Sequence, residues 1–168
     1  MSLSPLPMAE FSAACAALPL VSIDLVVTNP DGQLLLGLRN NAPARGWWFT
    51  PGGRIRKNEP LADARLRVAQ DELGLPASVL ARAIPMGAWD HFYPDSAFDA
   101  RVSTHYVNLP LWLALTRDEE QDLALPQGPG EQHAKWQWLA LDQAASDASV
   151  HAYVRVYAGW VTQRCTAI

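Results

Sequence analysis

The segment from residue 52 to residue 75, GGRIRKNEPLADARLRVAQDELGL, constrains the fold of this chain more than any other. The two glycines at its start predict a sharp backbone turn or a close approach to a ligand. Asn58 as an N-cap and Pro60 in the first turn predict the start of a helix. The helix is expected to end at Leu73, because Gly74 is a typical residue just beyond a helix C-terminus.

The side chains of this predicted helix indicate a cation site. Val68, Asp71 and Glu72 share one face, because residues three and four apart stack on the same side of a helix. Backbone carbonyls in the preceding loop and carboxylates on the helix offer the oxygen ligands that a hard cation such as Mg²⁺ prefers. A solvated acidic helix after a glycine turn is the alternative, and it leaves the spacing of Glu59 and Arg67 unexplained.

The spacing of these residues also resembles a known motif, the Nudix box, G-x5-E-x7-R-E-U-x-E-E-x-G-U, in which U is an apolar residue. Counted from Gly53, the matching positions are Glu59, Arg67, Glu72, Gly74 and Leu75. Two glutamates of the box are absent, because Val68 stands at the first of them and Asp71 at the next. Nudix enzymes that hydrolyse a phosphoanhydride usually crowd several glutamates there, to hold metal ions and deprotonate water. The resemblance therefore implies fewer metal ions here and a catalytic base from elsewhere.

Length and composition predict one globular domain over residues 1–168, with an N-terminal helical extension over residues 1–18. Hydrophobic residues make up 49% and charged residues 18% of the 168, which is ordinary globular composition. A net charge of −4 argues against general nucleic-acid binding, although local arginines can still bind an anionic substrate. Two cysteines form neither a disulfide framework nor a zinc set, which favours a cytoplasmic protein. The apolar N-terminal stretch is too short and too often interrupted by proline for a signal peptide or a membrane span.

The remaining elements follow from local patterns, and together they predict a mixed α/β (α+β) sandwich, a β-sheet with flanking helices. We expect helices at 9–18 and 150–161, and strands at 21–27, 33–39, 87–93 and 136–139. A short strand is expected within 47–53, and a long strand at 103–115, where the internal proline implies a sheet edge or a bulge. The acidic residues at 118–122 predict a solvated turn.

Several polar residues occupy positions that suit a binding site. Asp24 lies inside a predicted strand, where it either faces a ligand or sits on an exposed face. Arg39 and Arg54 leave loops beside the predicted metal site and could grip a diphosphate in bidentate fashion, although a lone arginine is usually a surface charge. Gln132 and His133 stand at the mouth of a proline-glycine loop.

Outside the box the chain is similar to one Nudix branch, the GDP-mannose mannosyl hydrolases. The shared sequence segments are PLVSIDLVV, LLLGLRNNAPARGWWFTPGGR, WDHFY, STHYV and EQH, so the similarity extends from residue 19 to about residue 138. This resemblance implies hydrolysis of GDP-mannose or another GDP-hexose, such as GDP-glucose, to GDP and free hexose. Water would attack the anomeric carbon with inversion, and the enzyme would be a homodimer.

The resemblance also assigns roles to residues. Mg²⁺, with Mn²⁺ as a substitute, would be held by the Gly52 carbonyl, Glu72 and Gln132. His133 would be the general base, Arg39, Arg54 and Tyr106 would stabilise the leaving GDP, and Asp24 and His91 would face the sugar. Phe11 is a candidate for stacking on guanine, or else an ordinary core residue.

Two other functions stay open at this stage. A conventional Nudix pyrophosphohydrolase would use Asp71 and Glu72 and release a nucleoside monophosphate, but Val68 counts against it. A non-catalytic sensor of nucleotide sugars would need a broken metal site, and the presence of Glu72, Gln132 and His133 counts against that.

Overall fold

A computed structural model describes residues 7–166 of the chain. Its helices are α1 Met8–Ala17, α2 Leu61–Leu73, α3 Ala77–Leu80, α4 Arg117–Gln121, α5 Leu141–Ser146 and α6 Ala152–Cys165. Its strands are β1 Leu20–Thr28, β2 Gln33–Arg39, β3 Trp48–Phe49, β4 Gly52–Arg54, β5 Ile84–Pro85, β6 Trp89–Tyr93, β7 Thr104–Asn108, β8 Leu111–Ala114 and β9 His133–Ala140.

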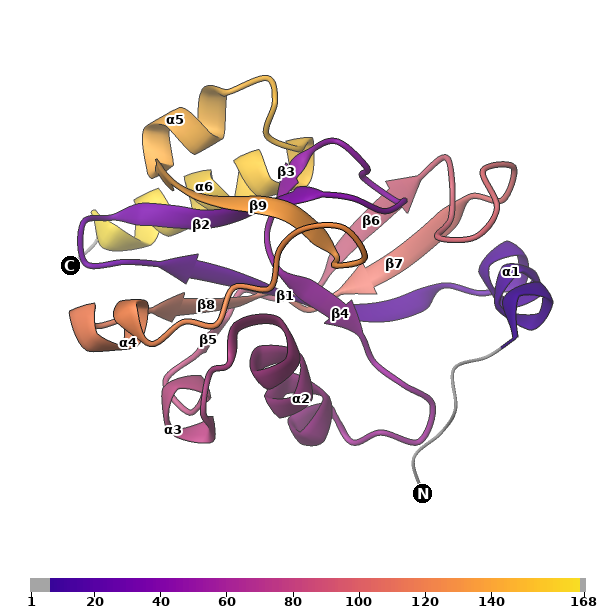
Figure 1. Ribbon diagram of the computed structural model, residues 1–168, viewed down its shortest axis with the longest axis horizontal. Coiled ribbons are helices and arrows are strands. Elements are labelled where there is room, and N and C mark those ends of the chain that lie inside the picture. The colour runs from indigo at the N-terminus through magenta and orange to yellow at the C-terminus, as the bar shows by residue number, and fades with distance from the viewer. Residues whose placement is uncertain (1–6, 167–168) are drawn as a thin grey trace.

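Strand β1 is the centre of the sheet (Figure 1). It pairs with β2 and β4 in antiparallel fashion and with β7 and β8 in parallel fashion. Strand β9 adds to β2, and β6 adds to β7, both antiparallel. The sheet is therefore mixed, and it brings β4, which contains the two glycines of the predicted cation-binding segment, next to β1.

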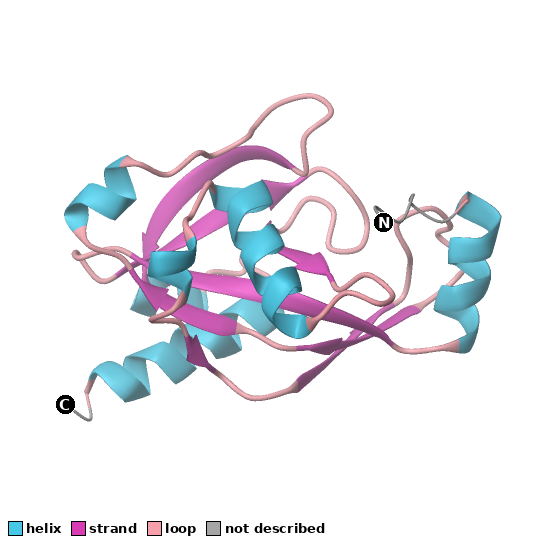
Figure 2. Ribbon diagram, turned by 90° about the horizontal axis from the view of Figure 1, so that it is seen from below, coloured by secondary structure: helices cyan, strands magenta, loops and turns pink. Residues whose placement is uncertain are grey.

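Alternation along β1 divides the core into two layers, because successive side chains of a strand point to opposite faces. Ile23, Leu25 and Val27 pack with the buried side of α2. Val26 faces the other layer, which contains α6. Figure 2 shows α2 across one face of the sheet and α6 behind the opposite face. These two layers confirm the predicted α+β sandwich.

Helix α2 follows the prediction at its end but not at its start. Gly74 caps it in the left-handed conformation (φ 68°), as expected for a glycine C-cap. Asn58 is not the N-cap: its φ is 62°, so it turns the loop, and Pro60 precedes the first helical residue, Leu61. The prediction was wrong because asparagine also favours left-handed turn positions, which leave the same sequence signature.

Three other predicted elements differ from the structure. The single strand over 103–115 is two strands, β7 and β8, because Pro110 has no N–H to continue a ladder. The acidic stretch over 118–122 forms most of the short helix α4, which Thr116 and Glu119 start with a reciprocal capping box and which Asp122 caps at its C-terminus. Strand β9 begins at His133 rather than at Trp136.

Helix α1 matches the predicted N-terminal helix, and residues 1–6 of the predicted extension lie outside the described part. Figure 1 places α1 to one side of the sheet, near the start of β1. Between residues 7 and 166, no helix has the length and apolar character needed to cross a membrane.

Candidate active site

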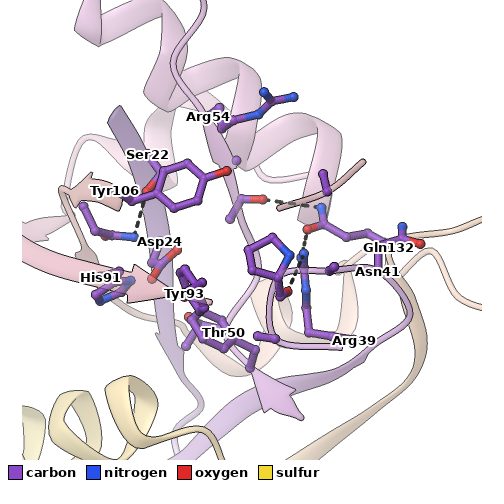
Figure 3. Close-up of a pocket in the computed structure, with 18 of the residues that line it drawn as sticks. Ser22, Asp24, Arg39, Asn41, Thr50, Arg54, His91, Tyr93, Tyr106 and Gln132 are labelled. Carbon is purple, nitrogen blue, oxygen red and sulfur yellow. Dashed lines mark hydrogen bonds between the residues drawn. The ribbon is translucent and has the colours of Figure 1, made fainter. Parts of the chain in front are cut away.

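A pocket of about 400 Å³ opens where β1, β4, β6 and β7 meet the loop after β2 (Figure 3). Eight of the nine site residues predicted from the sequence line it: Asp24, Arg39, Gly52, Arg54, Glu72, His91, Tyr106 and Gln132. The ninth, His133, does not. Residues from six secondary-structure elements and the connector before β9 thus converge on one cavity.

The three predicted metal ligands meet at one side of this pocket. The side-chain amide nitrogen of Gln132 donates to Oε1 of Glu72 at 2.6 Å and lies 3.4 Å from the carbonyl oxygen of Gly52. The amide oxygen of Gln132 accepts a hydrogen bond from Arg39. Burial raises the pKa of Glu72 to about 7, opposed by the positive charge of Arg39. The positively polarised amide nitrogen thus lies between two oxygens that a cation could bind.

Packing on α2 fixes the position of Glu72. Val68, one turn earlier, is 1% exposed and lies against Gly53 in β4, which is an extended strand rather than the sharp turn that the glycine pair suggested. A β-carbon at Gly53 would lie 3.1 Å from Cγ2 of Val68, a tight contact from which the valine side chain would have to move back by a few tenths of an ångström. Val68 therefore replaces the carboxylate of the Nudix box with an apolar contact that brings the helix close to β4.

The donor set fits a divalent cation of the hard type. It consists of the Glu72 carboxylate, the Gly52 carbonyl and the amide of Gln132, whose oxygen would have to turn from Arg39 towards the ion, and magnesium prefers such oxygen ligands. Within residues 7–166, no three His, Cys, Asp or Glu side chains gather in a way that could hold a metal ion. A cation here would therefore draw only part of its coordination from protein and the rest from substrate oxygens or water.

Arg39 and Arg54 supply positive charge to the same pocket. Desolvation lowers the pKa of Arg39, and nearby Glu72 is the largest opposing influence. The guanidinium of Arg54 stacks 4.1 Å from the ring centre of Phe11 in α1. Phe11 is 4% exposed and also packs edge-on against Phe98, so its ring is a fixed surface on which the Arg54 guanidinium stacks. The N-terminal helix thus has a direct role in positioning a pocket arginine.

The other end of the pocket is rich in hydrogen-bond acceptors. Asp24 is buried in the pocket wall and is therefore not on an exposed face of the sheet, which was the alternative that the sequence left open. Its Oδ2 accepts from the hydroxyl of Tyr157 at 3.0 Å, and that hydroxyl lies 2.9 Å from Nε2 of His91. Burial raises the pKa of Asp24 to about 6 and lowers the pKa of His91 to about 4. His91 is therefore neutral at pH 7, and Asp24 is mainly ionised.

Sequence reasoning missed the residues that complete this end. Tyr157 is fully buried on α6, 133 residues along the chain from its partner Asp24, so no local pattern connects them. Thr50 and Asn108 also line the pocket. Asn108 was detectable, because it lies two residues after Tyr106 and so shares its face of strand β7.

His133 lies outside the pocket wall, as the first residue of β9 and the register partner of Arg39. It is 1% exposed, and its imidazole fills the space that a side chain at Gly37 would occupy: a β-carbon there would lie 2.4 Å from the ring. The ring also packs against Trp136, with 4.3 Å between centres. Burial lowers the pKa of His133 to about 3, and its Nε2 has no partner within the described chain.

Asp71 points away from the candidate metal site. Its side chain is 58% exposed and lies 3.7 Å from Arg67, one turn earlier on α2. It does not line the pocket with Glu72.

Comparison with known proteins identifies the family of this chain. The family model described as NUDIX domain matches residues 18–158. The low-salt glycan biosynthesis protein Agl8 of Haloferax volcanii is 43% identical over 113 residues, which are 67% of this chain and 70% of Agl8. The human m7GpppN-mRNA hydrolase NUDT17 is 31% identical over 135 residues, or 77% of this chain and 40% of that protein.

Solved structures show the same fold. A MutT NUDIX hydrolase from Burkholderia pseudomallei superposes with a TM-score of 0.62 at 25% identity, covering 84% of this chain and 97% of that one. The predicted Nudix fold is thereby confirmed, and the chain belongs to the Nudix family.

Proposed function

We propose that the protein hydrolyses GDP-mannose, or a closely related GDP-hexose, to GDP and free hexose. The observation that carries this proposal is the division of the pocket into two chemically different ends. Arg39 and Gln132 lie at one side of the pocket and His91 at the opposite side (Figure 3), while Asp24 stands between them as the register partner of Gly52. A nucleotide sugar has the matching pair of groups, a charged diphosphate and a neutral polyhydroxylated ring.

Relatives support a substrate of this class. Agl8 is named for glycan biosynthesis, and nucleotide sugars are the activated donors from which glycans are built. Nudix enzymes in general act on nucleoside diphosphate derivatives and use divalent metal ions. The choice of guanine, of mannose and of a homodimer rests on the sequence resemblance, and the cytoplasmic location rests on the cysteine content.

The leaving group determines the roles at the cationic end. We assign the Gly52 carbonyl, Glu72 and Gln132 to Mg²⁺, with Mn²⁺ as a substitute. When bound, the ion would neutralise charge on the diphosphate. Arg39 and Arg54 would bind the same oxygens, and because negative charge grows there as the anomeric bond breaks, they stabilise the transition state more than the ground state.

Tyr106 lines the pocket beside these arginines and is 9% exposed. Burial raises the pKa of its hydroxyl, so it stays protonated and can donate to a phosphate oxygen. A protonated phenol adds a donor without adding charge, which suits the junction between the two ends.

Water must reach the anomeric carbon from the face opposite GDP, and we retain His133 as its base. In this structure the imidazole lies behind the pocket wall, so the proposal requires the start of β9 to leave its pairing with Arg39 and turn the ring into the pocket. Gly128 and Gly130 in the connector before β9 have φ values of 114° and 92°, conformations that other residues rarely adopt. The neighbouring Gln132 already reaches the pocket.

Product analysis tests the proposal. Incubation with GDP-mannose and Mg²⁺ should yield GDP and mannose in equal amounts. GMP and mannose 1-phosphate would instead show pyrophosphohydrolase activity, which the exposed Asp71 and apolar Val68 argue against. Tight binding of GDP-mannose without any product would show a sensor.

A further inference from the structure

Two buried polar atoms in the pocket wall have no hydrogen-bond partner within residues 7–166. They are Oγ1 of Thr50, in a residue that is 1% exposed, and Oδ1 of Asn108, in a residue that is 2% exposed. Buried polar atoms are almost always paired, because leaving one unpaired costs stability. Two such atoms in one pocket indicate groups that are kept for a ligand.

Both residues lie on the face of the sheet that carries Asp24. Asn108 is the register partner of Ser22, which is two residues before Asp24 and so shares its face. Thr50 is two residues before Gly52, the register partner of Asp24. Side chains on this one face therefore form the floor of the acceptor-rich end.

The hydrogen bonds of Asn108 identify which atom is free. Its amide nitrogen donates to Oγ of Ser22 at 3.0 Å, and its side chain is near enough to Asp24 to lower the pKa of that carboxyl group. A carboxylate can only accept, so the amide nitrogen must face it and the amide oxygen is left for another donor. Figure 3 shows the dashed bond to Ser22 beside Asp24.

We propose that Thr50 and Asn108 determine sugar specificity by binding hydroxyl groups of the hexose. The inference rests on the proposed function for the identity of the ligand as a nucleotide sugar. The Asn108 oxygen and the Asp24 carboxylate require donors, and the Thr50 hydroxyl can donate or accept. Sugar hydroxyls do both. A phosphate group ionised at neutral pH offers no donor to this end, and the arginines attract it to the other.

A site built to hydrogen-bond a hydroxyl discriminates strongly against analogues that lack it, because its own buried polar groups are then left unpaired. The pocket should therefore prefer a fully hydroxylated hexose over a deoxyhexose at the contacted carbon. Replacing the protein group by an apolar isostere should erase that preference.

The test is Thr50→Val, measured with GDP-mannose and with its 2-, 3-, 4- and 6-deoxy analogues. For one analogue, the ratio of kcat/KM between parent sugar and analogue should fall roughly 10- to 100-fold in the variant. Thr50→Ser retains the hydroxyl and should preserve most of the ratio. Asn108→Leu should lower the ratio for an analogue as well. Unchanged ratios for all analogues in both apolar variants would overturn the proposal.

Stability distinguishes a ligand group from a structural one. Thr50→Val removes an unpaired buried hydroxyl, so its melting temperature should equal or exceed that of the parent. Thr104→Val is the matched control: Thr104 is 2% exposed, and its hydroxyl donates to the Asp95 carbonyl at 2.8 Å. That variant should melt lower and keep the sugar ratios. A Thr50→Val variant that melts well below the parent would show a structural hydroxyl.

A binding measurement separates this inference from the proposed function. Should the enzyme fail to form GDP and hexose, calorimetric titration with GDP-mannose and with GDP still applies. Thr50→Val should weaken binding of GDP-mannose and leave binding of GDP unchanged. Equal weakening of both ligands would refute the role of Thr50 whatever reaction the enzyme performs.

Discussion

Glu59→Gln tests how the loop that carries Arg54 is held. Oε1 of Glu59 lies 2.6 Å from Nε of Arg67, and Oε2 accepts from Nη2 of Arg67 at 2.9 Å and from the backbone N–H of Arg56 at 2.8 Å. Nη2 of Arg67 also donates to the Arg54 carbonyl at 2.8 Å. The pair therefore fastens the loop between β4 and α2 to the helix.

The pKa of Glu59 gives the size of the effect. Hydrogen bonds from Arg67 lower this pKa from 4.5 to about 2. One pKa unit corresponds to 1.36 kcal/mol, so this lower pKa corresponds to at most about 3.4 kcal/mol of the free energy of unfolding. The side chains of Glu59 and Arg67 are 13% and 22% exposed, so solvent screening reduces the expected contribution to about 1–2 kcal/mol.

The pH dependence follows from the direction of the change. Because the folded state lowers the pKa, the stabilisation is fully present above pH 4.5 and is lost as pH falls towards 2. Urea denaturation should show Glu59→Gln less stable than the parent by about 1–2 kcal/mol at pH 7. The difference in unfolding free energy between the variant and the parent should be smaller at pH 3.5 than at pH 7.

Glu10→Gln is the control, because Glu10 is exposed and makes no ion pair among the residues that the structure describes. It should show neither effect. A Glu59→Gln variant as stable as the parent at pH 7, or a difference that stays constant down to pH 3.5, would refute the reasoning.

Three further substitutions address the reaction itself. Glu72→Gln should abolish most activity and the response to divalent ions in a metal titration, and undiminished Mg²⁺ affinity would assign the ion to another group. His133→Gln should lower kcat by roughly 10²- to 10⁴-fold with GDP affinity unchanged, and a fully active variant would place the base elsewhere. Tyr157→Phe removes the hydroxyl between Asp24 and His91. Losing its hydrogen bonds should cost about 1–3 kcal/mol of transition-state stabilisation, which is a roughly 5- to 150-fold lower kcat/KM with inhibition by GDP unchanged. A parallel loss of GDP affinity would instead indicate general disruption of the pocket.

The sequence predicted those parts of the site that depend on short-range geometry. The spacing from Gly53 to Leu75 contains a turn, a helix and a cap, all local structures, and α2 ends where Gly74 predicted. Strand alternation likewise explains why Asp24 faces the pocket. The pairing of Asp24 with Tyr157 was not predictable, because it depends on how α6 packs across the sheet.

The position of His133 shows the same limit. Its neighbour Gln132 reaches the pocket, but the ladder between β2 and β9 shifts register between Gly37 and Arg39 and turns His133 into the core. Such a shift depends on two strands that are almost a hundred residues apart. The N-cap prediction for Asn58 failed for a different reason, since one residue type serves both caps and left-handed turns.

Hydrolysis of GDP-mannose in water enriched in ¹⁸O tests the proposed reaction most directly. Attack at the anomeric carbon predicts the label in the hexose, unlabelled GDP, and first-formed hexose of the β configuration from an α-linked substrate. Mass spectrometry locates the label, and proton NMR during the first turnovers identifies the anomer. Label in a phosphate product would contradict the account, because water would then have attacked phosphorus rather than carbon.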